Sequence, residues 1–456
     1  MCIFEELNRL LVRYERLIKI APMKKLLLIL FGATFLTACI KNGAFDKFDV
    51  DNPIEITSPS PEAIMTKVSL SERQEVMAQG GNSFAFNCLR ELSKLNPGNL
   101  ILSPLSLQYA LAMTANGACG ETVREITTVL GFGDDTDAMN EYCNLLLNSF
   151  PALDQGVELM LTDAMMIRND AVLRTSFQNT LASFYYAPVT FFSLYDKEST
   201  VNQLNEWAYR CTNGYINPFV ELDDIGDNDI AYILNALYFK APWSGGVNHS
   251  MFDSSLTQKA QPFYLKGGGK GAADYMVTSR HFPYLKQDGY EMLEIPYAGG
   301  KYAMFILLPE EKDGLDKMLS KLTGQSWAKD VAALTKEVNV CLYLPKFEAE
   351  NRFELQEMLQ SLGVRKAFDN RCAEFDAMFV RQETDQRFWI SKVLQKARIG
   401  VNEWGTEAAA VTAVMMKDSG AGGKTMVFKA DHPFIYLIAE KSTGIILFEG
   451  IFTGQS

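Results

Sequence analysis

Few residues in this sequence have the types and spacings that enzyme chemistry requires. The chain contains three histidines, His249, His281 and His432, and none of them belongs to a His-Glu-x-x-His motif. The eight cysteines include no Cys-x-x-Cys pair and none that lies near a histidine, so a zinc or redox site is unsupported. The glycine-rich segment 267–271 lacks the earlier glycine and the Ser or Thr after the lysine that a phosphate-binding loop needs. We therefore predict that the protein is not an enzyme and binds no metal and no cofactor.

One segment has a composition suited to a different task, which is to enter a sheet as an extra strand. Residues 403–414 read Glu-Trp-Gly-Thr-Glu-Ala-Ala-Ala-Val-Thr-Ala-Val. The small uncharged side chains that would share one face of a strand are Thr406, Ala408, Ala410 and Thr412. Such a segment is a poor core strand on its own, but it can slide between two existing strands without clashes. The alternative is an alanine-rich helix over 407–413, because these residues have fair helix propensity.

Alternating apolar residues predict that a strand precedes this segment. In residues 388–401 most odd positions are apolar, including Trp389 and Ile399, whereas the even positions include Lys396 and Arg398. This alternation is typical of a strand with one buried face.

The remainder of the chain mixes helices and strands irregularly. Helical spacing of apolar residues predicts helices at 84–95, 104–117 and 123–130, with Ser103 as the N-cap of the second and Gly131 as the end of the third. Apolar runs predict strands at 302–308, 434–439 and 445–452, and the last two form a hairpin. Helices come first and strands later, without regular βαβ alternation, which predicts an α+β architecture.

The composition is that of a folded, acidic protein. Hydrophobic residues make up 48% and charged residues 21% of the 456 positions, which allows a sizeable core and excludes disorder as the main state. The chain has 43 basic and 55 acidic residues, so its formal net charge is −12. This acidic balance argues against a nucleic-acid partner.

The N-terminal region has the pattern of an export signal. Met23-Lys24-Lys25 precedes an apolar run at 26–33, which is too short to span a bilayer, and Leu36-Thr37-Ala38-Cys39 follows. This end resembles the lipobox of bacterial lipoproteins, in which the cysteine is lipidated and the peptide before it is removed. The resemblance implies an exported protein that is lipid-anchored through Cys39 to the bacterial cell envelope and faces the periplasm or the extracellular space. The predicted divisions are 1–22 as an extension upstream of the true start, 23–38 as the signal peptide, 39–71 as a tether and 72–456 as the folded domain.

The segment at 403–414 resembles the hinge of the reactive-centre loop in the serpin family. The residues that carry this match are Glu403-x-Gly405-Thr406-Glu407-Ala408-Ala409-Ala410. Further matches occur in the family's order along the chain, at 99–106, 235–240 with Trp243, 344–347, 431–434 and 448–450. The resemblance implies an α+β serpin fold with three β-sheets, about eight or nine helices and an exposed reactive-centre loop.

Membership of this family would imply a suicide inhibitor of serine endopeptidases, with cysteine endopeptidases as a second target class. A target protease cuts the exposed loop, and the hinge then inserts as a new strand in the central sheet and traps the protease. The implied hinge residues are Glu403, Gly405, Thr406, Glu407, Ala408, Ala409, Ala410 and Thr412. Counting along the loop from the hinge glycine places the reactive bond at Ser419–Gly420, with Met415, Met416 and Lys417 as rival positions.

The resemblance also implies residues that control the opening of the sheet, in two regions that the family calls the shutter and the breach. They are Ser103, Ser106, Asn235, Trp243 and Gln395. Gln395 stands where the family often has a histidine, and its amide can still donate and accept hydrogen bonds. The alternative function is a non-inhibitory serpin that acts as a binding or structural surface protein, and such members tend to carry bulky, charged or proline residues in the hinge. We expect a monomer.

Overall fold

The computed structural model describes residues 66–227, 229–245, 251–334, 337–381, 387–406 and 425–454. The predictions for residues 1–65, which include lipidation of Cys39, lie outside the described residues. So do part of the hinge and all candidates for the reactive bond, which are Glu407, Ala408, Ala409, Ala410, Thr412, Met415, Met416, Lys417, Ser419 and Gly420. Within the described part of the chain, no helix has both the length and the hydrophobicity needed to span a bilayer.

The described residues contain nine α-helices, most of them in the first half of the chain. They are α3 (Glu72–Leu95), α4 (Pro104–Gly117), α5 (Gly120–Leu130), α6 (Thr136–Ser149), α7 (Thr175–Thr180), α8 (Lys197–Cys211), α9 (Leu315–Lys321), α10 (Gly324–Ala333) and α11 (Gln356–Leu362). Each of the three predicted helices lies within one of these elements.

Capping geometry explains where the predicted helices begin and end. The Ser103 side chain accepts a hydrogen bond from the Ser106 backbone N–H, and a proline occupies the first turn of α4. Gly131 ends α5 with φ of 71°, a left-handed conformation that glycine adopts without strain. Helix α3 begins twelve residues before the predicted start, because Ser71 and Gln74 form a capping box ahead of it.

The central sheet has six strands. In spatial order they are β10 (Phe347–Glu354), β11 (Leu394–Asn402), β12 (Gly405–Thr406), β4 (Ala231–Pro242), β2 (Glu158–Arg168) and β3 (Val189–Phe192). All neighbours pair antiparallel except β2 and β3.

The other nine strands are connected, eight of them in one path. In order they are β1 (Leu100–Leu102), β15 (Ile446–Phe452), β14 (Phe434–Glu440), β8 (Tyr302–Pro309), β7 (Tyr290–Pro296), β6 (Lys270–Gln287), β9 (Glu337–Pro345) and β13 (Met426–Lys429), while β5 (Gln258–Tyr264) pairs with β6. The long strand β6 pairs with β7 near its end and with β9 and β5 before that, so two sheets share it. The predicted α+β class with three sheets and eight or nine helices is therefore confirmed for the described residues.

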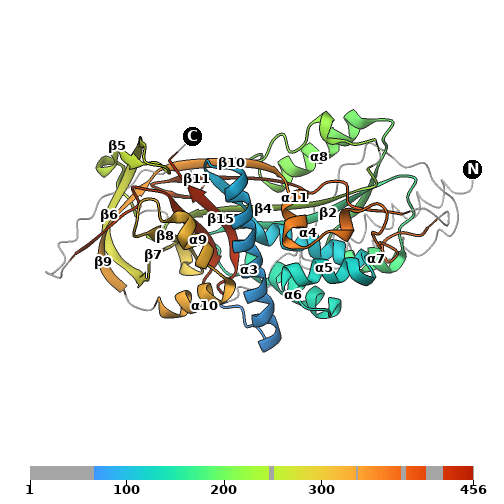
Figure 1. Ribbon diagram of the computed structural model, residues 1–456, viewed down its shortest axis with the longest axis horizontal. Coiled ribbons are helices and arrows are strands. Elements are labelled where there is room, and N and C mark those ends of the chain that lie inside the picture. The colour runs from blue at the N-terminus through green and yellow to red at the C-terminus, as the bar shows by residue number, and fades with distance from the viewer. Residues whose placement is uncertain are drawn as a thin grey trace, which may run out of the picture. The chain divides into compact units, whose positions relative to one another are not determined.

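Both faces of the central sheet are covered. Figure 1 shows α8 on one side of β2 and β4, and α4 and α6 on the other. Even-numbered strand residues such as Ala164 and Leu234 pack with Trp207 of α8, whereas odd-numbered ones such as Leu161 and Leu237 belong to the main core. This alternation is the two-residue period of a strand.

The strand predicted at 388–401 is shorter in the structure, because β11 begins only at Leu394. Within β11 the odd positions are buried, as the alternation predicted. Before it, the backbone N–H of Ile390 donates to the carbonyl of Ala367, outside the sheet. The first part of the predicted strand, residues 388–393, is therefore not part of the sheet, and this part of the prediction is wrong.

Candidate functional site

The described part of the hinge forms a two-residue strand inside the central sheet. Strand β12 pairs antiparallel with both of its neighbours, and Thr406 lies opposite Val401 of β11 and Ala241 of β4. Thr406 is only 1% exposed, and its hydroxyl oxygen lies 2.5 Å from that of Tyr297. At these two residues the hinge has the strand conformation, while the choice between strand and helix at 407–413 lies outside the described residues.

Gly405 is the residue that lets the hinge enter between the two strands. Its φ is +152°, and a Cβ at this position would lie 2.1 Å from the carbonyl oxygen of Ala241 and 2.7 Å from the Cα of Pro242. Both contacts are with backbone atoms that are held in the ladder. A side chain at position 405 is therefore incompatible with this pairing.

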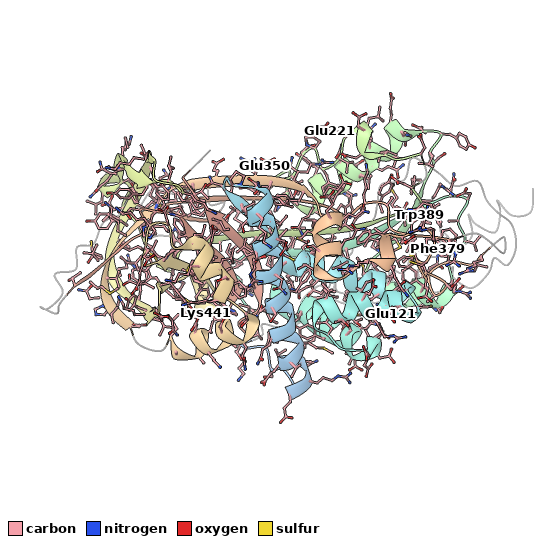
Figure 2. The ribbon with its side chains drawn as sticks, in the orientation of Figure 1. Glu121, Glu221, Glu350, Phe379, Trp389 and Lys441 are labelled. Atoms are coloured by element: carbon pink, nitrogen blue, oxygen red, sulfur yellow. The ribbon has the colours of Figure 1, made fainter. Side chains whose placement is uncertain are left out.

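Beyond β12, the facing edges of β4 and β11 border a gap. In the described part of the chain β12 is the only strand between them. From β12 to Ala231 on β4 and Leu394 on β11, no other described strand pairs with these two edges. Two cavities lie along this gap, one of about 10 Å³ near Asn235 and one of about 70 Å³ farther from the hinge. The larger cavity is lined mainly by apolar side chains, including Phe379 and Trp389, which Figure 2 labels.

The smaller cavity brings together four of the five residues predicted to control sheet opening. Ser103, Ser106, Asn235 and Gln395 all line it. The side chain of Gln395 accepts from the Ser103 N–H at 3.0 Å and donates to the Ser103 carbonyl at 2.9 Å. The Ser103 hydroxyl in turn donates to the carbonyl of Leu447 at 2.9 Å. Gln395 thus ties β11 to the start of α4 through both ends of its amide.

The fifth residue, Trp243, lies at the hinge end of the gap. Its backbone N–H donates to the Trp404 carbonyl at 3.0 Å, and its indole N–H donates to the Asn402 carbonyl at 2.8 Å. Its ring stacks on Tyr297 with centroids 4.8 Å apart and an interplanar angle of 7°. The tryptophan therefore fixes the backbone on both sides of Glu403, and Trp404 stays at this end of the sheet.

An ion pair holds the first hinge residue. Glu403 is 5% exposed, and its carboxylate lies 2.9 Å from the Lys346 Nζ and accepts from the Thr257 hydroxyl at 2.8 Å. Burial opposes ionisation of this carboxyl, but hydrogen bonds from Lys346, the backbone and Thr257 outweigh that effect and lower the pKa of Glu403. Glu403 is therefore an anion whose charge is compensated where the chain turns into β12.

The sequence analysis missed several residues of this site. Lys346 was named only as part of the segment 344–347 that resembles the serpin family. Thr257, Tyr297 and Asp163 were not singled out. Asp163 accepts a hydrogen bond from the Asn235 amide across β2 and β4. These contacts join positions far apart in the chain, and a single sequence contains no signal that pairs them.

The described residues contain no cluster of three or more His, Cys, Asp or Glu side chains placed to hold a metal ion. The cysteines in this part of the chain are Cys88, Cys119, Cys143, Cys211, Cys341 and Cys372, and all six are free thiols.

Comparison with known proteins identifies the family. Residues 79–454 match the family model described as "Serpin (serine protease inhibitor)". Antichymotrypsin-2 of Bombyx mori is 28% identical over 390 residues, covering 84% of this chain and all of that protein. Intracellular coagulation inhibitor 2 of Tachypleus tridentatus is 31% identical and covers 81% of this chain and 88% of its own length. The crystal structure of the thermophilic serpin tengpin in its native state has a TM-score of 0.75 at 26% identity, and covers 87% of this chain and 97% of its own.

The chain belongs to the serpin family. Members of this family are generally protease inhibitors and not enzymes. The fold that holds this hinge is therefore one whose usual activity is protease inhibition. The same fold holds the polar contacts of Gln395 and of Trp243.

Replacing Gly405 by alanine is expected to displace β12, because the added methyl would collide with the backbone of β4. Hydrogen–deuterium exchange of the peptide containing residues 401–406 should become about tenfold faster or more. Gly400→Ala is the matched control, since a Cβ there meets only ordinary contacts, the nearest at 3.5 Å. Equal protection of this peptide in both variants would contradict the requirement for glycine.

Removing either partner of the Glu403–Lys346 pair is expected to destabilise the protein by about 1–3 kcal/mol at neutral pH. Glu403→Gln and Lys346→Met should each lower the thermal midpoint, and the double variant should lose less than the sum of the two. Because the pKa of Glu403 is lowered, its contribution is present above the ordinary value of 4.5 and is lost as the pH falls through the folded-state value. Glu403→Gln should lack this loss in acid. Strict additivity of the two substitutions would show that the pair is not coupled.

Proposed function

We propose that this protein is a suicide inhibitor of serine endopeptidases, with cysteine endopeptidases as a second target class. The observation that carries the proposal is the position of β12, whose two described residues, Gly405 and Thr406, lie as a strand between β4 and β11. The chain continues from Thr406 into the small-residue segment that the sequence predicts to be insertable. The family membership of the chain supports the same conclusion.

The chemistry of trapping begins at the predicted reactive bond. The hydroxyl of a target serine protease attacks the carbonyl carbon of Ser419, or that of the rival residue Met415, Met416 or Lys417. The bond to the next residue breaks, its nitrogen leaves as an amine that has gained a proton, and the target stays joined to this chain as an ester. The hinge side of the loop, now separated from the residues after the cut and carrying the protease at its end, can then extend β12.

Pairing in the gap between β4 and β11 beyond β12 provides the free energy for this extension. A strand inserted there gains ladder hydrogen bonds on both edges, from β4 and from β11. It also covers the apolar cavity of about 70 Å³ between β4 and 388–394. The predicted inward-facing residues Ala408, Ala410 and Thr412 are small enough to enter without displacing the core. Insertion carries the attached protease along the sheet before the ester is hydrolysed.

Thr406→Arg is expected to convert the inhibitor into a substrate. The arginine would place a charge where the side chain is 1% exposed and next to the Tyr297 hydroxyl, which opposes further insertion. The variant should be cut at the same bond but form at least about tenfold less SDS-stable complex with the protease. Gel electrophoresis after mixing with a panel of trypsin-like, chymotrypsin-like and elastase-like enzymes measures this ratio.

The matched control is Glu407→Arg, one residue along the chain, which the sequence predicts to face away from the core in the inserted strand. It should trap protease nearly as well as the parent. Equal trapping by both variants would contradict insertion. Cleavage of the parent without any stable complex would support the alternative, a non-inhibitory surface protein.

The inhibitor is proposed to act at the cell envelope. Support comes from the lipobox-like sequence that ends at Cys39 and from the proline-bearing tether at 40–71 that follows it. A tether of this kind would keep the reactive loop clear of the membrane surface and within reach of proteases outside the cytoplasm.

Cys39→Ser is expected to release the protein from the membrane fraction, because serine cannot form the thioether to the lipid. Fractionation of cells followed by detection of this chain measures the release. Cys119→Ser is the matched control, since Cys119 is a free, partly buried thiol of the folded domain, and this variant should remain in the membrane pellet. Retention of Cys39→Ser in the pellet would refute the lipid anchor.

A further inference from the structure

One polar pair in the central sheet is incomplete as it stands. Asp163 of β2 and Asn235 of β4 lie opposite each other, and the Asn235 amide N–H donates to Asp163 Oδ1. Asp163 is 1% exposed. The two remaining atoms of the pair, Asp163 Oδ2 and Asn235 Oδ1, are buried and have no hydrogen-bond partner among the described residues.

A single proton would satisfy both of these atoms. An ionised carboxylate is only an acceptor, so Asp163 Oδ2 and the amide oxygen of Asn235 are then two acceptors with no donor between them. A protonated carboxyl can donate from Oδ2 to Asn235 Oδ1 while Oδ1 still accepts from the amide N–H. We propose that Asp163 and Asn235 form a proton-binding site in the central sheet, in which the bound proton joins β2 to β4 through two reciprocal hydrogen bonds.

A neighbouring pair shows this reciprocal geometry between two amides. Asn116 of α4 donates to Asn140 Oδ1 at 2.7 Å, and Asn140 of α6 donates to Asn116 Oδ1 at 2.8 Å. That pair needs no extra proton because each amide both donates and accepts. Asp163 and Asn235 form one of the two hydrogen bonds of such a pair, and the donor needed for the second is the proton of the neutral acid.

The surroundings of Asp163 favour the neutral form. The titratable groups that interact with it from the packed elements are Tyr109 of α4, Cys143 of α6, Tyr185 of the helical turn Leu181–Tyr185, and Cys211 of α8. Burial raises the pKa of each of these four, to about 12 for both cysteines, so all are neutral at physiological pH. No cation among the described residues lowers the pKa of Asp163, which burial raises to about 7 against the opposing effect of the Asn235 hydrogen bond.

The site makes the stability of the sheet depend on pH. The folded protein holds this proton more tightly than the unfolded chain, whose aspartate has the ordinary value of 3.8. The stabilisation is therefore complete below the unfolded value and is lost as the pH rises through the folded value of about 7. Above that pH an uncompensated carboxylate remains beside the amide oxygen of Asn235. Asn235 belongs to β4, the strand that borders the gap.

Infrared spectroscopy of the whole protein tests the proposal directly. A protonated carboxylic acid has its own carbonyl stretch, so the parent should show such a band at about pH 5.5 that is lost by about pH 8.5. Asp163→Asn should lack this titrating band, and Asp154→Asn, which changes another buried aspartate, should retain it. Carbon-13 labelling of aspartate carboxyls should shift the band in the parent itself, which assigns it to an aspartate even if a variant fails to fold.

Thermal unfolding provides the second measurement. Asp163→Asn can form an amide pair like that of Asn116 and Asn140 and should keep its melting temperature across this pH range. The parent should lose about 2–3 °C relative to the variant between pH 5.5 and pH 8.5. A titrating carbonyl band that shifts with the aspartate label and persists in Asp163→Asn, or the absence of any such band in the parent, would overturn the proposal. So would a melting difference between parent and variant that does not change with pH. A band that does not shift with the label belongs to another buried acid such as Glu449.

Discussion

The edge of a β-strand carries backbone N–H and C=O groups that need hydrogen-bond partners. In the central sheet, Gly405 and Thr406 are the only described residues that pair between β4 and β11. This gap in the pairing is the constraint on which the other features of the site depend. The hinge must be able to enter it, which requires glycine at 405. Where no described strand lies between β4 and β11, other contacts must connect the two halves of the sheet.

Those contacts are polar and come from outside the ladder. At the hinge end, Trp243 and the Glu403–Lys346 pair hold the chain where it turns into β12. Near the middle, Gln395 connects β11 to the start of α4 through Ser103. Side-chain hydrogen bonds are directional and contribute little net free energy each, so they can position two sheet halves without preventing a new strand from separating them. A ladder between β4 and β11 would have to be broken before any insertion.

Much of this arrangement could be predicted from the sequence, and the part that could not has a physical reason. The caps at Ser103 and Gly131 and the alternation within β11 are local patterns, and each was predicted at its position. The hinge match located Gly405 and Thr406, although nothing local indicates that they are already paired on both sides. The start of β11 was placed too early because an apolar alternation does not reveal where the backbone hydrogen bonds go. The partners Lys346 and Asp163 were missed because each is defined by a contact across the fold.

Two buried acids show which parts of the protein can influence the proposed insertion. Glu449 of β15 is fully buried with both carboxyl oxygens unpartnered among the described residues, and burial raises its pKa well above the ordinary value. Its strand β15 is paired on both edges, by β1 and β14, so it gains no new strand neighbour when a strand is added to the central sheet. Only a difference between two states can shift the balance between them. Asp163 is different, because its partner Asn235 belongs to β4, the strand that would gain a new neighbour and that lines the cavity this neighbour would fill. A proton at Asp163 can therefore affect the native and the inserted sheets unequally, whereas Glu449 lies on a strand whose pairing is the same in both.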